Sequence, residues 1–263
     1  MIGWFKRWRG TSEGGRFQKY TIYYGSVSPS ILDALKRYDL VVLEPHHLTA
    51  DQVRELREAG TFVIGYLSVM EWPEWNETRG RSLADEDFLH KDGRRVHLPE
   101  WNSYLMDLRR PQYRELLLRE IEMQIAGKGM DGVILDTVGD IDDYVQEPLL
   151  RTELIHGYLE LLSSIRAAHP QLWLMQNGGF SFVSLAAGRI QAFLWEDWRD
   201  ELIREEWVRE RIELLKPLQK NGLRVFTVNC VPGRNGGVAA EKLGFVHCAR
   251  AGDYSIWDGG NGG

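Results

Sequence analysis

The chain has 263 residues, of which 43% are hydrophobic and 27% charged, as is ordinary for a globular protein with one large core. The formal net charge of −6 argues against a nucleic-acid-binding surface, which needs a basic excess. Two cysteines are too few for a disulfide framework, and we expect Cys230 and Cys248 to be buried thiols, with a single disulfide as the alternative.

The chain begins with a basic and aromatic stretch, Met1–Arg9, and we expect residues 1–18 to form a flexible segment, an interfacial anchor being the alternative. This stretch lacks the apolar run and cleavage site of a secretory signal. Two locations stay open: the sequence as written would be cytoplasmic, and a signal removed upstream would place the protein outside the cell. No apolar stretch approaches the ~18 residues that a membrane span needs.

Strand-like segments follow one another along most of the remaining chain. Leu40–Leu43 is a continuous apolar run, which is typical of a parallel strand buried on both faces. We expect strands at residues 19–24, 40–43, 61–67, 131–136, 172–176, 191–196, 224–230 and 245–249, and a further short strand at 104–108. Residues 68–101, between two of these strands, form a long, polar segment rich in Trp.

Helix signals lie between the predicted strands. Ser28-Pro29 places an N-cap before a proline at the first helical position, and Thr49 and Gln52 form a capping box for a helix that ends at Gly60. A third helix begins at Pro111 and ends near Gly127. Further helices are expected at residues 152–168, 203–218 and 238–242.

About eight strands with helices between them predict a parallel sheet with right-handed crossovers. We favour an α/β fold of the (β/α)8 TIM-type barrel class over an open doubly wound sheet, because no glycine-rich phosphate loop follows the first strand. The expected domain is a single barrel over residues 19–257, followed by a flexible tail at 258–263. We expect the protein to be a monomer.

Nearly every predicted strand ends in a carboxylate, an amide or an aromatic ring. In a β/α barrel these ends meet at one rim, where the active site forms. Buried polar groups must find partners, so their convergence predicts a polar pocket for a hydroxyl-rich ligand. The candidates are Tyr24, Glu44, Tyr66, Glu71, Asp107, Asp136, Asp140, Asn177, Trp195, Glu196 and Asn229.

A pair of carboxylates is the machinery of glycoside hydrolysis, in which one carboxyl protonates the leaving oxygen and the other attacks carbon or activates water. Asp136 and Glu196 each close an apolar strand and are the predicted catalytic pair. We expect Asp136 to act as nucleophile or electrostatic stabiliser and Glu196 as general acid/base. The structural alternatives are a helix N-cap at Asp136, beside Thr137, and a rim ion pair between Glu196 and Arg199.

The other candidates also have structural interpretations. Glu44 precedes a proline and would satisfy backbone amides of its own loop. Asp107 is followed closely by Arg109 and would form an ion pair. Asn177 and Asn229 would cap loops.

The sequence predicts no metal and no other cofactor. Asp140, Asp142 and Asp143 resemble a calcium loop loosely but lack its glycine and its closing glutamate. His46 and His47 are adjacent and would not both face one ion from a regular element.

Several segments together resemble glycoside hydrolase family 114. They are Asp39–Pro45, Val63–Glu71, Gly129–Val138, Gln176–Gly179 and Trp195-Glu196, and the resemblance extends from about Tyr20 to Phe245. The family's characterised activity is endo-α-1,4-polygalactosaminidase on a TIM barrel. The sequence departs from the family pattern at Met70 and at Gly139, where family members carry a small residue and an acid; Asp140 stands next to the latter.

The resemblance implies the same catalytic carboxylates, Asp136 and Glu196. It also implies sugar contacts by Tyr24, Glu44, Tyr66, Glu71 and Asn177. The insert Trp72–Trp75 is a further departure from the family pattern, and we expect it to reshape the sugar subsites. The leading hypothesis is thus an endo-acting glycosidase on a polysaccharide or oligosaccharide. The alternatives are a carbohydrate-binding barrel without turnover, and a lyase or isomerase, which would need a closed pocket.

Overall fold

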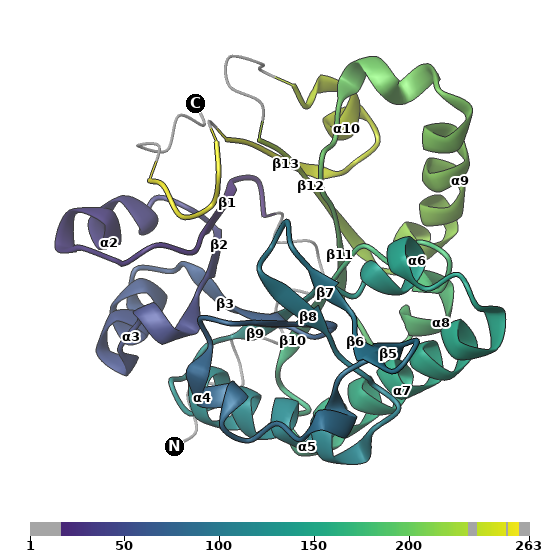
Figure 1. Cartoon of the computed structure of the whole chain (residues 1–263). Coiled ribbons are helices and arrows are strands. Elements are labelled where there is room, and N and C mark those ends of the chain that lie inside the picture. The colour runs from purple at the N-terminus through teal and green to yellow at the C-terminus, as the bar shows by residue number, and fades with distance from the viewer. Residues whose placement is uncertain (1–16, 231–235, 251, 258–263) are drawn as a thin grey trace.

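The computed structural model describes residues 17–230, 236–250 and 252–257, and within them eight parallel strands form one sheet (Figure 1). In spatial order these are β1 (Tyr20–Tyr23), β2 (Leu40–Leu43), β3 (Phe62–Ser68), β9 (Gly132–Asp136), β10 (Trp173–Asn177), β11 (Ala192–Trp195), β12 (Arg224–Asn229) and β13 (Val246–Ala249). The first and last strands are in contact, and the Arg250 guanidinium donates to the carbonyl of Ile22 across that seam. The sheet therefore curls into a nearly closed barrel.

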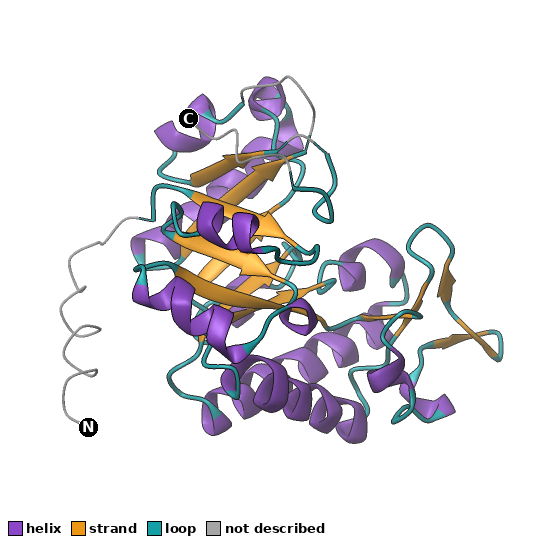
Figure 2. Cartoon of the chain, turned by 90° about the vertical axis from the view of Figure 1, so that its left-hand side faces the viewer, coloured by secondary structure: helices purple, strands orange, loops and turns teal. Residues whose placement is uncertain are grey.

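Helices connect consecutive strands and cover the outside of the barrel (Figures 1 and 2). They are α2 (Pro29–Leu35), α3 (Ala50–Glu58), α5 (Pro111–Glu120) with a π-helical extension η3 (Ile121–Ala126), α7 (Pro148–Ala168), α8 (Val183–Ala186), α9 (Glu206–Lys220) and α10 (Val238–Lys242). The strand order follows the chain throughout, without the reversal of a doubly wound sheet. The predicted TIM-type barrel is confirmed.

Local signals account for several helix starts. Ser28 caps α2 ahead of Pro29, and Thr49 and Gln52 form the expected capping box of α3. Helix α7 begins at Pro148, four residues before the predicted start, because the Glu147 carboxylate accepts the amides of Leu149 and Leu150.

Alternation along the strands divides the apolar core into two layers. Leu40, Val42, Ile134 and Leu194 belong to a cluster inside the barrel. Their neighbours in the chain, such as Leu135, belong to a larger cluster between the sheet and the helices. Successive side chains of a strand point to opposite faces, so this parity also decides which strand-end residues face the barrel mouth.

A long excursion separates β3 from β9. It contains β4 (Glu71–Pro73), α4 (Glu77–Gly80), η2 (Asp85–Asp87), β5 (His90–Lys91), β6 (Arg94–Arg95), β7 (His97–Leu98) and β8 (Ser103–Leu105). Strands β4, β8 and β7 form an antiparallel sheet, and β5 and β6 form a hairpin that projects away from the barrel (Figure 2). The strand predicted at 104–108 thus exists only as β8, and it pairs in this excursion instead of in the barrel.

Three short helices complete the fold: η1 (Pro45–His47), α6 (Asp140–Tyr144) and η4 (Asp200–Arg204). Cys248 is a buried free thiol as expected, and Cys230 is a free thiol that is only partly buried. Over the described residues, none of the helices has the length and apolar character needed to cross a bilayer. The predicted flexible ends, 1–18 and 258–263, lie outside the described residues except for Phe17 and Gln18.

Candidate active site

The predicted site forms at the mouth of the barrel. On each strand the inward-facing side chains are apolar until the strand ends, and the next inward-facing position lies at the mouth. The strand-end residues at such inward-facing positions are Tyr24, Glu44, Tyr66, Asp136, Asn177 and Glu196. The interior below them is filled by apolar side chains, so these polar groups form the layer that a ligand meets first.

The backbone turns sharply after each of the two central carboxylates. Thr137 and Asp197 follow them with φ values of +61° and +54°, in the left-handed region that non-glycine residues rarely adopt. The Thr137 hydroxyl accepts the amides of Val69 (3.1 Å) and Met70 (2.8 Å), which holds this strained turn. The Asp136 carboxyl is therefore presented on a rigid support.

Asp136 lies at the end of β9 and is partly exposed to solvent. The Asn177 amide donates to its Oδ1 at 2.6 Å, and the Tyr66 hydroxyl is a second partner. Burial raises the pKa of Asp136, and these hydrogen bonds together with the Thr137 backbone amide offset part of that effect. The donors stabilise the ionised carboxylate.

Glu196 follows β11 and is also partly exposed. The Tyr254 hydroxyl donates to its Oε1 at 2.7 Å. Burial, together with the nearby charge of Asp136, raises the pKa of Glu196 to about 7, while hydrogen bonds from Tyr254 and Asn177 hold it down. Asn177 thus donates to Asp136 and lowers the pKa of Glu196, and its strand β10 lies between the strands that the two carboxyls follow.

The two structural alternatives for this pair are wrong. Helix α6 begins at Asp140, so Gly139 and not Asp136 occupies its N-cap position. Among the described residues, no ion pair joins Glu196 to Arg199. The pair is instead one acid with a pKa near neutrality beside one carboxylate that is surrounded by hydrogen-bond donors, and this contrast is typical of an acid and its nucleophilic partner.

Three tyrosines line the mouth beside the pair. The Tyr24 ring lies 4.5 Å from that of Tyr66 and 5.3 Å from that of Tyr254, measured between centroids. Burial raises the pKa of all three hydroxyls, so they remain protonated and able to donate. Sequence reasoning missed Tyr254, because it lies in the loop after β13, where no periodic pattern marks it.

Glu44 adopts the structural role foreseen as its alternative. Its Oε1 accepts the backbone amide of His46 at 3.1 Å and contacts Nδ1 of the same residue at 2.7 Å, so it caps η1. It also lines a small pocket with Tyr66 and Trp75, on the side of the mouth formed by β2 and β3. Glu44 thus borders the site, although its carboxylate is already occupied.

Glu71 and Asp140 form a second carboxyl pair next to Asp136. Glu71 is 8% and Asp140 9% exposed, and the charge of Asp136 raises the pKa of each. Burial is the larger cause in both, and hydrogen bonding between the two carboxyls raises the pKa of Asp140 while it lowers that of Glu71. Asp140 is therefore the partner that carries the proton.

Three predicted site residues do not join the inward layer. Trp195 is 5% exposed and packs against Phe180 and Trp198 between the sheet and the helices, because its parity along β11 is opposite to that of Glu196. Asn229 has the same outward parity along β12. Neither side chain therefore belongs to the inward layer at the barrel mouth.

Asp107 is also committed elsewhere. It lies beyond β8, outside the barrel strands, and is 2% exposed. Its carboxylate accepts the backbone amide and the guanidinium of Arg109, with the closest contact at 2.7 Å. The ion pair foreseen as its alternative is present, and Asp107 is a structural residue.

The three aspartates of α6 do not form a calcium loop. Asp142 pairs with Arg151 and accepts the hydroxyl of Ser181, and the side chain of Asp143 is exposed. Over residues 17–230, 236–250 and 252–257, no three His, Cys, Asp or Glu side chains are grouped to hold a metal ion.

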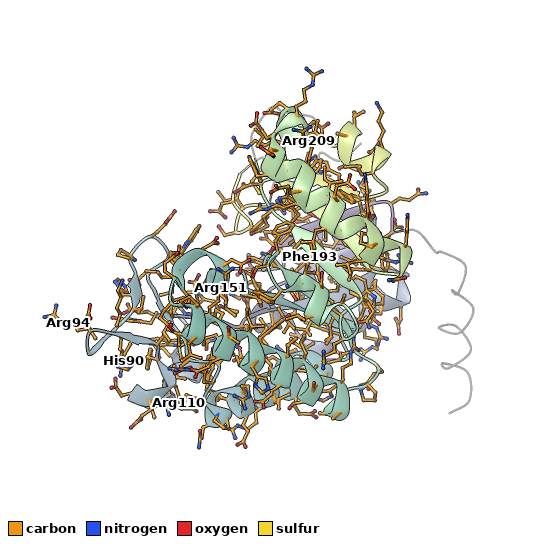
Figure 3. The ribbon with its side chains drawn as sticks, turned by 90° about the vertical axis from the view of Figure 1, so that its right-hand side faces the viewer. His90, Arg94, Arg110, Arg151, Phe193 and Arg209 are labelled. Carbon is orange, nitrogen blue, oxygen red and sulfur yellow. The ribbon has the colours of Figure 1, made fainter. Side chains whose placement is uncertain are left out.

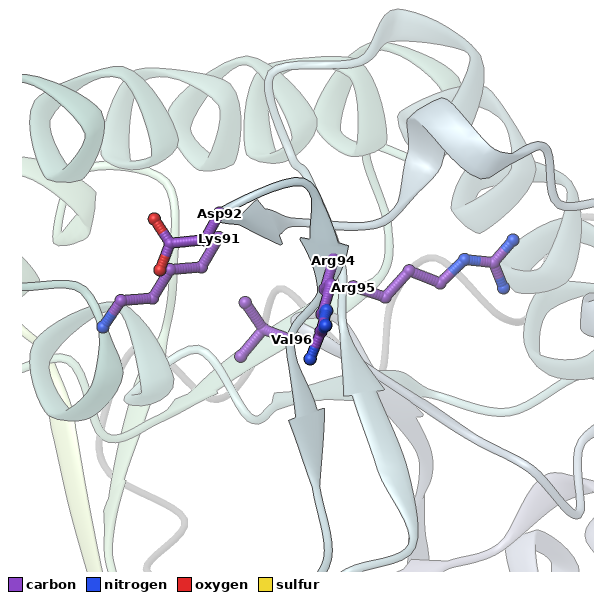
Figure 4. A pocket seen from close by; sticks show the side chains of 5 residues that line it. All are labelled: Lys91, Asp92, Arg94, Arg95 and Val96. Carbon is purple, nitrogen blue, oxygen red and sulfur yellow. The ribbon is translucent and has the colours of Figure 1, made fainter.

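The hairpin β5–β6 carries a separate shallow hollow, lined by Lys91, Asp92, Arg94, Arg95 and Val96 (Figure 4). None of the candidate residues lines it. His90 and Arg94 stand at the outer end of the excursion, well away from Phe193 in the helix-covered layer of the barrel (Figure 3). The hollow is therefore not part of the carboxylate site.

Comparison with known proteins agrees with the barrel fold. The family model of glycoside-hydrolase family GH114 matches residues 6–255. No curated protein matches the chain. Among solved structures, the glycoside hydrolase domain of PelA from Pseudomonas aeruginosa is similar, with a TM-score of 0.74, 22% identity, and coverage of 90% of this chain and 96% of that one.

Two further solved structures share the fold. Aspergillus fumigatus Ega3, in complex with galactosamine, has a TM-score of 0.69 at 16% identity and covers 91% of this chain and 92% of its own. The GH36 α-galactosidase AgaB from Geobacillus stearothermophilus has a TM-score of 0.57 at 10% identity, with coverage of 92% of this chain and 40% of that one.

Proposed function

The chain belongs to glycoside hydrolase family GH114 and is a glycosidase; we propose that it cleaves a galactosamine-containing polysaccharide with Asp136 and Glu196. The observation that carries this assignment is the convergence of the two carboxyls at the barrel mouth, where Asp136 and Glu196 end strands on either side of β10 and the Asn177 amide of β10 donates to Asp136 at 2.6 Å. The structure of Ega3 with galactosamine supports the choice of sugar, since the two chains share a fold.

The geometry supports a two-step displacement. With a pKa of about 7, Glu196 is about half protonated at neutral pH and mostly protonated below it, and it donates its proton to the glycosidic oxygen as the bond to the anomeric carbon breaks. Asp136 attacks that carbon from the other side, and Asn177 and Tyr66 stabilise its charge until then. Glu196, now ionised, takes a proton from the water that releases the sugar from Asp136.

The displacement by Asp136 implies retention of anomeric configuration. Retaining enzymes hold their carboxyl groups ~5–5.5 Å apart, whereas inverting enzymes leave ~6.5–9.5 Å for a water molecule. We propose the shorter separation, because the two carboxyls end strands on either side of β10. Proton NMR of the first product formed would show the configuration of the substrate, and the opposite configuration would contradict the displacement by Asp136.

The assignment is tested with Asp136→Asn and Glu196→Gln, in a reducing-end assay over a panel of polysaccharides that includes α-1,4-linked galactosamine. General acid catalysis contributes ~10²–10⁴-fold, and loss of the nucleophile is at least as severe, so both variants should lose nearly all turnover. Circular dichroism and thermal melting should show a folded barrel. Asp107→Asn, which removes a carboxyl outside the site, is the control and should keep its kcat.

The same assay separates the competing functions. A carbohydrate-binding barrel would bind the polymer without releasing reducing ends, and wild-type and variant proteins would then behave alike. Endo action predicts a ladder of oligosaccharides at early times, whereas release of single sugars would indicate an exo enzyme. We also propose a monomer, and light scattering at the enzyme's working concentration measures its mass directly.

A further inference from the structure

We propose that Glu71 and Asp140 form a subsite for the ammonium group of an amino sugar, walled by Trp101 and Tyr144, and that the subsite releases one proton when the ammonium binds. This inference rests on the proposed function and extends it, because it assigns the residues that distinguish a free amine from an acetylated one. It uses groups that the displacement by Asp136 does not need.

Glu71 is a buried carboxyl that is fixed in position without a cation. The Ser103 hydroxyl on β8 donates to its Oε2, which joins β4 to β8 at this point. Arg79 donates to the main-chain carbonyls of Glu71 (3.3 Å) and Ser68 (2.8 Å), but its own ion pair is with Glu120, at 2.7 Å. No cation among the described residues pairs with the carboxyl of Glu71.

One carboxyl oxygen of Asp140 lacks a hydrogen-bond donor among the described residues. The side chain of Asp140 is 9% exposed, and this oxygen, Oδ2, is buried. The group that it faces is the carboxyl of Glu71, and two carboxylates have no proton to share. One of them must be protonated, so the pair holds one proton and about one negative charge at neutral pH.

The surroundings of this pair favour a cation. Asp136 and Asp143 raise the pKa of Asp140 through their charges, after burial and Glu71 itself. Tyr144 lies four residues after Asp140 in α6. Burial raises the pKa of its hydroxyl, and the charges of Asp140, Glu100 and Glu71 raise it further. Arg79 pairs with Glu120 and Arg151 with Asp142, and the charge of Arg211 acts on Asp143. Among the described residues, Glu71 and Asp140 therefore have no ion-pair partner.

An ammonium group supplies what the pair lacks. It has three donors and a positive charge, so it satisfies the free oxygen of Asp140 and makes the second ionisation favourable. Asp140 then gives its proton to solvent, and two carboxylates hold one cation. An N-acetyl group has no charge and a single N–H, and it would leave the acid pair protonated and one oxygen without a partner.

Two exposed aromatic rings stand beside the pair. Trp101, in the turn between β7 and β8, is 61% exposed, and Tyr144 in α6 is 44% exposed. Trp101 and the carboxyls of Glu71 and Asp140 all influence the pKa of the Tyr144 hydroxyl, so the excursion and α6 contribute rings to the same region. Such rings present apolar faces that pack against sugar rings, with the polar carboxyls next to them.

The kinetic test uses Asp140→Asn, which keeps the shape of the side chain and removes its titratable group. It compares α-1,4-galactosamine oligosaccharides with their fully N-acetylated forms. We expect KM for the amine substrate to rise about 10–100-fold with kcat changed less than about threefold, as for the loss of a charge-assisted hydrogen bond. Asp51→Asn, which changes an exposed aspartate of α3 outside this cluster, is the control and should leave KM unchanged.

A binding test works without turnover and separates this inference from the proposed function. Calorimetry of galactosamine binding, in two buffers of different ionisation enthalpy, should show release of about one proton in wild type and none in Asp140→Asn. N-acetylgalactosamine should bind weakly and release none. Proton release with no hydrolysis of any substrate would refute the proposed function alone. Equal binding of both sugars, or an unchanged proton count in Asp140→Asn, would overturn the subsite.

Discussion

The hydroxyl of Tyr254 sets the upper pH limit of the enzyme, if Glu196 is the acid. It donates to Oε1 of Glu196 at 2.7 Å and thereby stabilises the ionised form of that carboxyl. Tyr254→Phe removes this hydrogen bond and keeps the ring, which packs 5.3 Å from the ring of Tyr24. The carboxylate loses a donor, so the pKa of Glu196 must rise.

The size of the effect follows from the bond that is lost. A hydrogen bond to a charged group contributes ~1.5–3 kcal/mol, and 1.36 kcal/mol corresponds to one pKa unit. The pKa of Glu196, which burial and the charge of Asp136 raise to about 7, should therefore move upward by about one to two pH units. Glu196 acts in its protonated form, so activity should persist to higher pH in the variant.

The measurement is the pH profile of kcat/KM, which reports ionisations in the free enzyme. In wild type the alkaline limb should have its midpoint near pH 7, and in Tyr254→Phe it should lie about one to two pH units higher. Tyr23→Phe is the matched control, because its hydroxyl donates to the carbonyl of Ser26 at 3.0 Å and touches neither carboxyl. Its profile should coincide with that of wild type.

Two outcomes would refute the reasoning. If the acidic limb moves upward instead, Glu196 works as a carboxylate, and the roles of Glu196 and Asp136 are exchanged. If neither limb moves, the bond from Tyr254 does not govern the ionisation that the rate depends on.

Three other substitutions test the rest of the structure. Asn177→Ala removes the amide that donates to Asp136 and lowers the pKa of Glu196, and it should lower kcat/KM by about 10–100-fold, measured by initial rates on a protein that still melts cooperatively. Asp107→Asn breaks a buried ion pair whose arginine reaches solvent, so urea unfolding should show a loss of about 1–3 kcal/mol with kcat unchanged; an inactive, stable variant would return Asp107 to the site. Gly157→Ala should also destabilise by about 1–3 kcal/mol, because its Cβ would lie 2.3 Å from the carbonyl oxygen of Leu108 on the neighbouring segment; a stabilised variant would show that α7 shifts freely.

The barrel was predictable because its signals are local. Apolar runs such as Leu40–Leu43 and caps such as Thr49 with Gln52 act within a few residues, and their alternation is enough to specify β/α units. The central site was predictable for the same reason. Asp136 and Glu196 end apolar strands, and strand ends meet at one rim in this fold.

The sequence also contains the alternation of side chains along each strand, which separates inward-facing from outward-facing residues. Trp195 and Glu196 are adjacent, so only one of them can face the barrel mouth, and the inward position of Leu194 identifies Glu196 as that residue. The same rule excludes Asn229. The alternation of side chains along each strand therefore decides which strand-end residues belong to the ligand-binding rim.

By itself, then, the sequence determined the alternating strands and helices, the barrel they form and the two carboxyls at its mouth, because these depend on short-range periodicity and on strand ends. Only the tertiary structure decided which groups meet there. Tyr254 reaches Glu196 from a loop 58 residues further along the chain, and Ser103 and Asp140 meet Glu71 from separate segments. Burial and neighbouring charge then separate an acid from a carboxylate, and both are properties of the folded chain that no local pattern encodes.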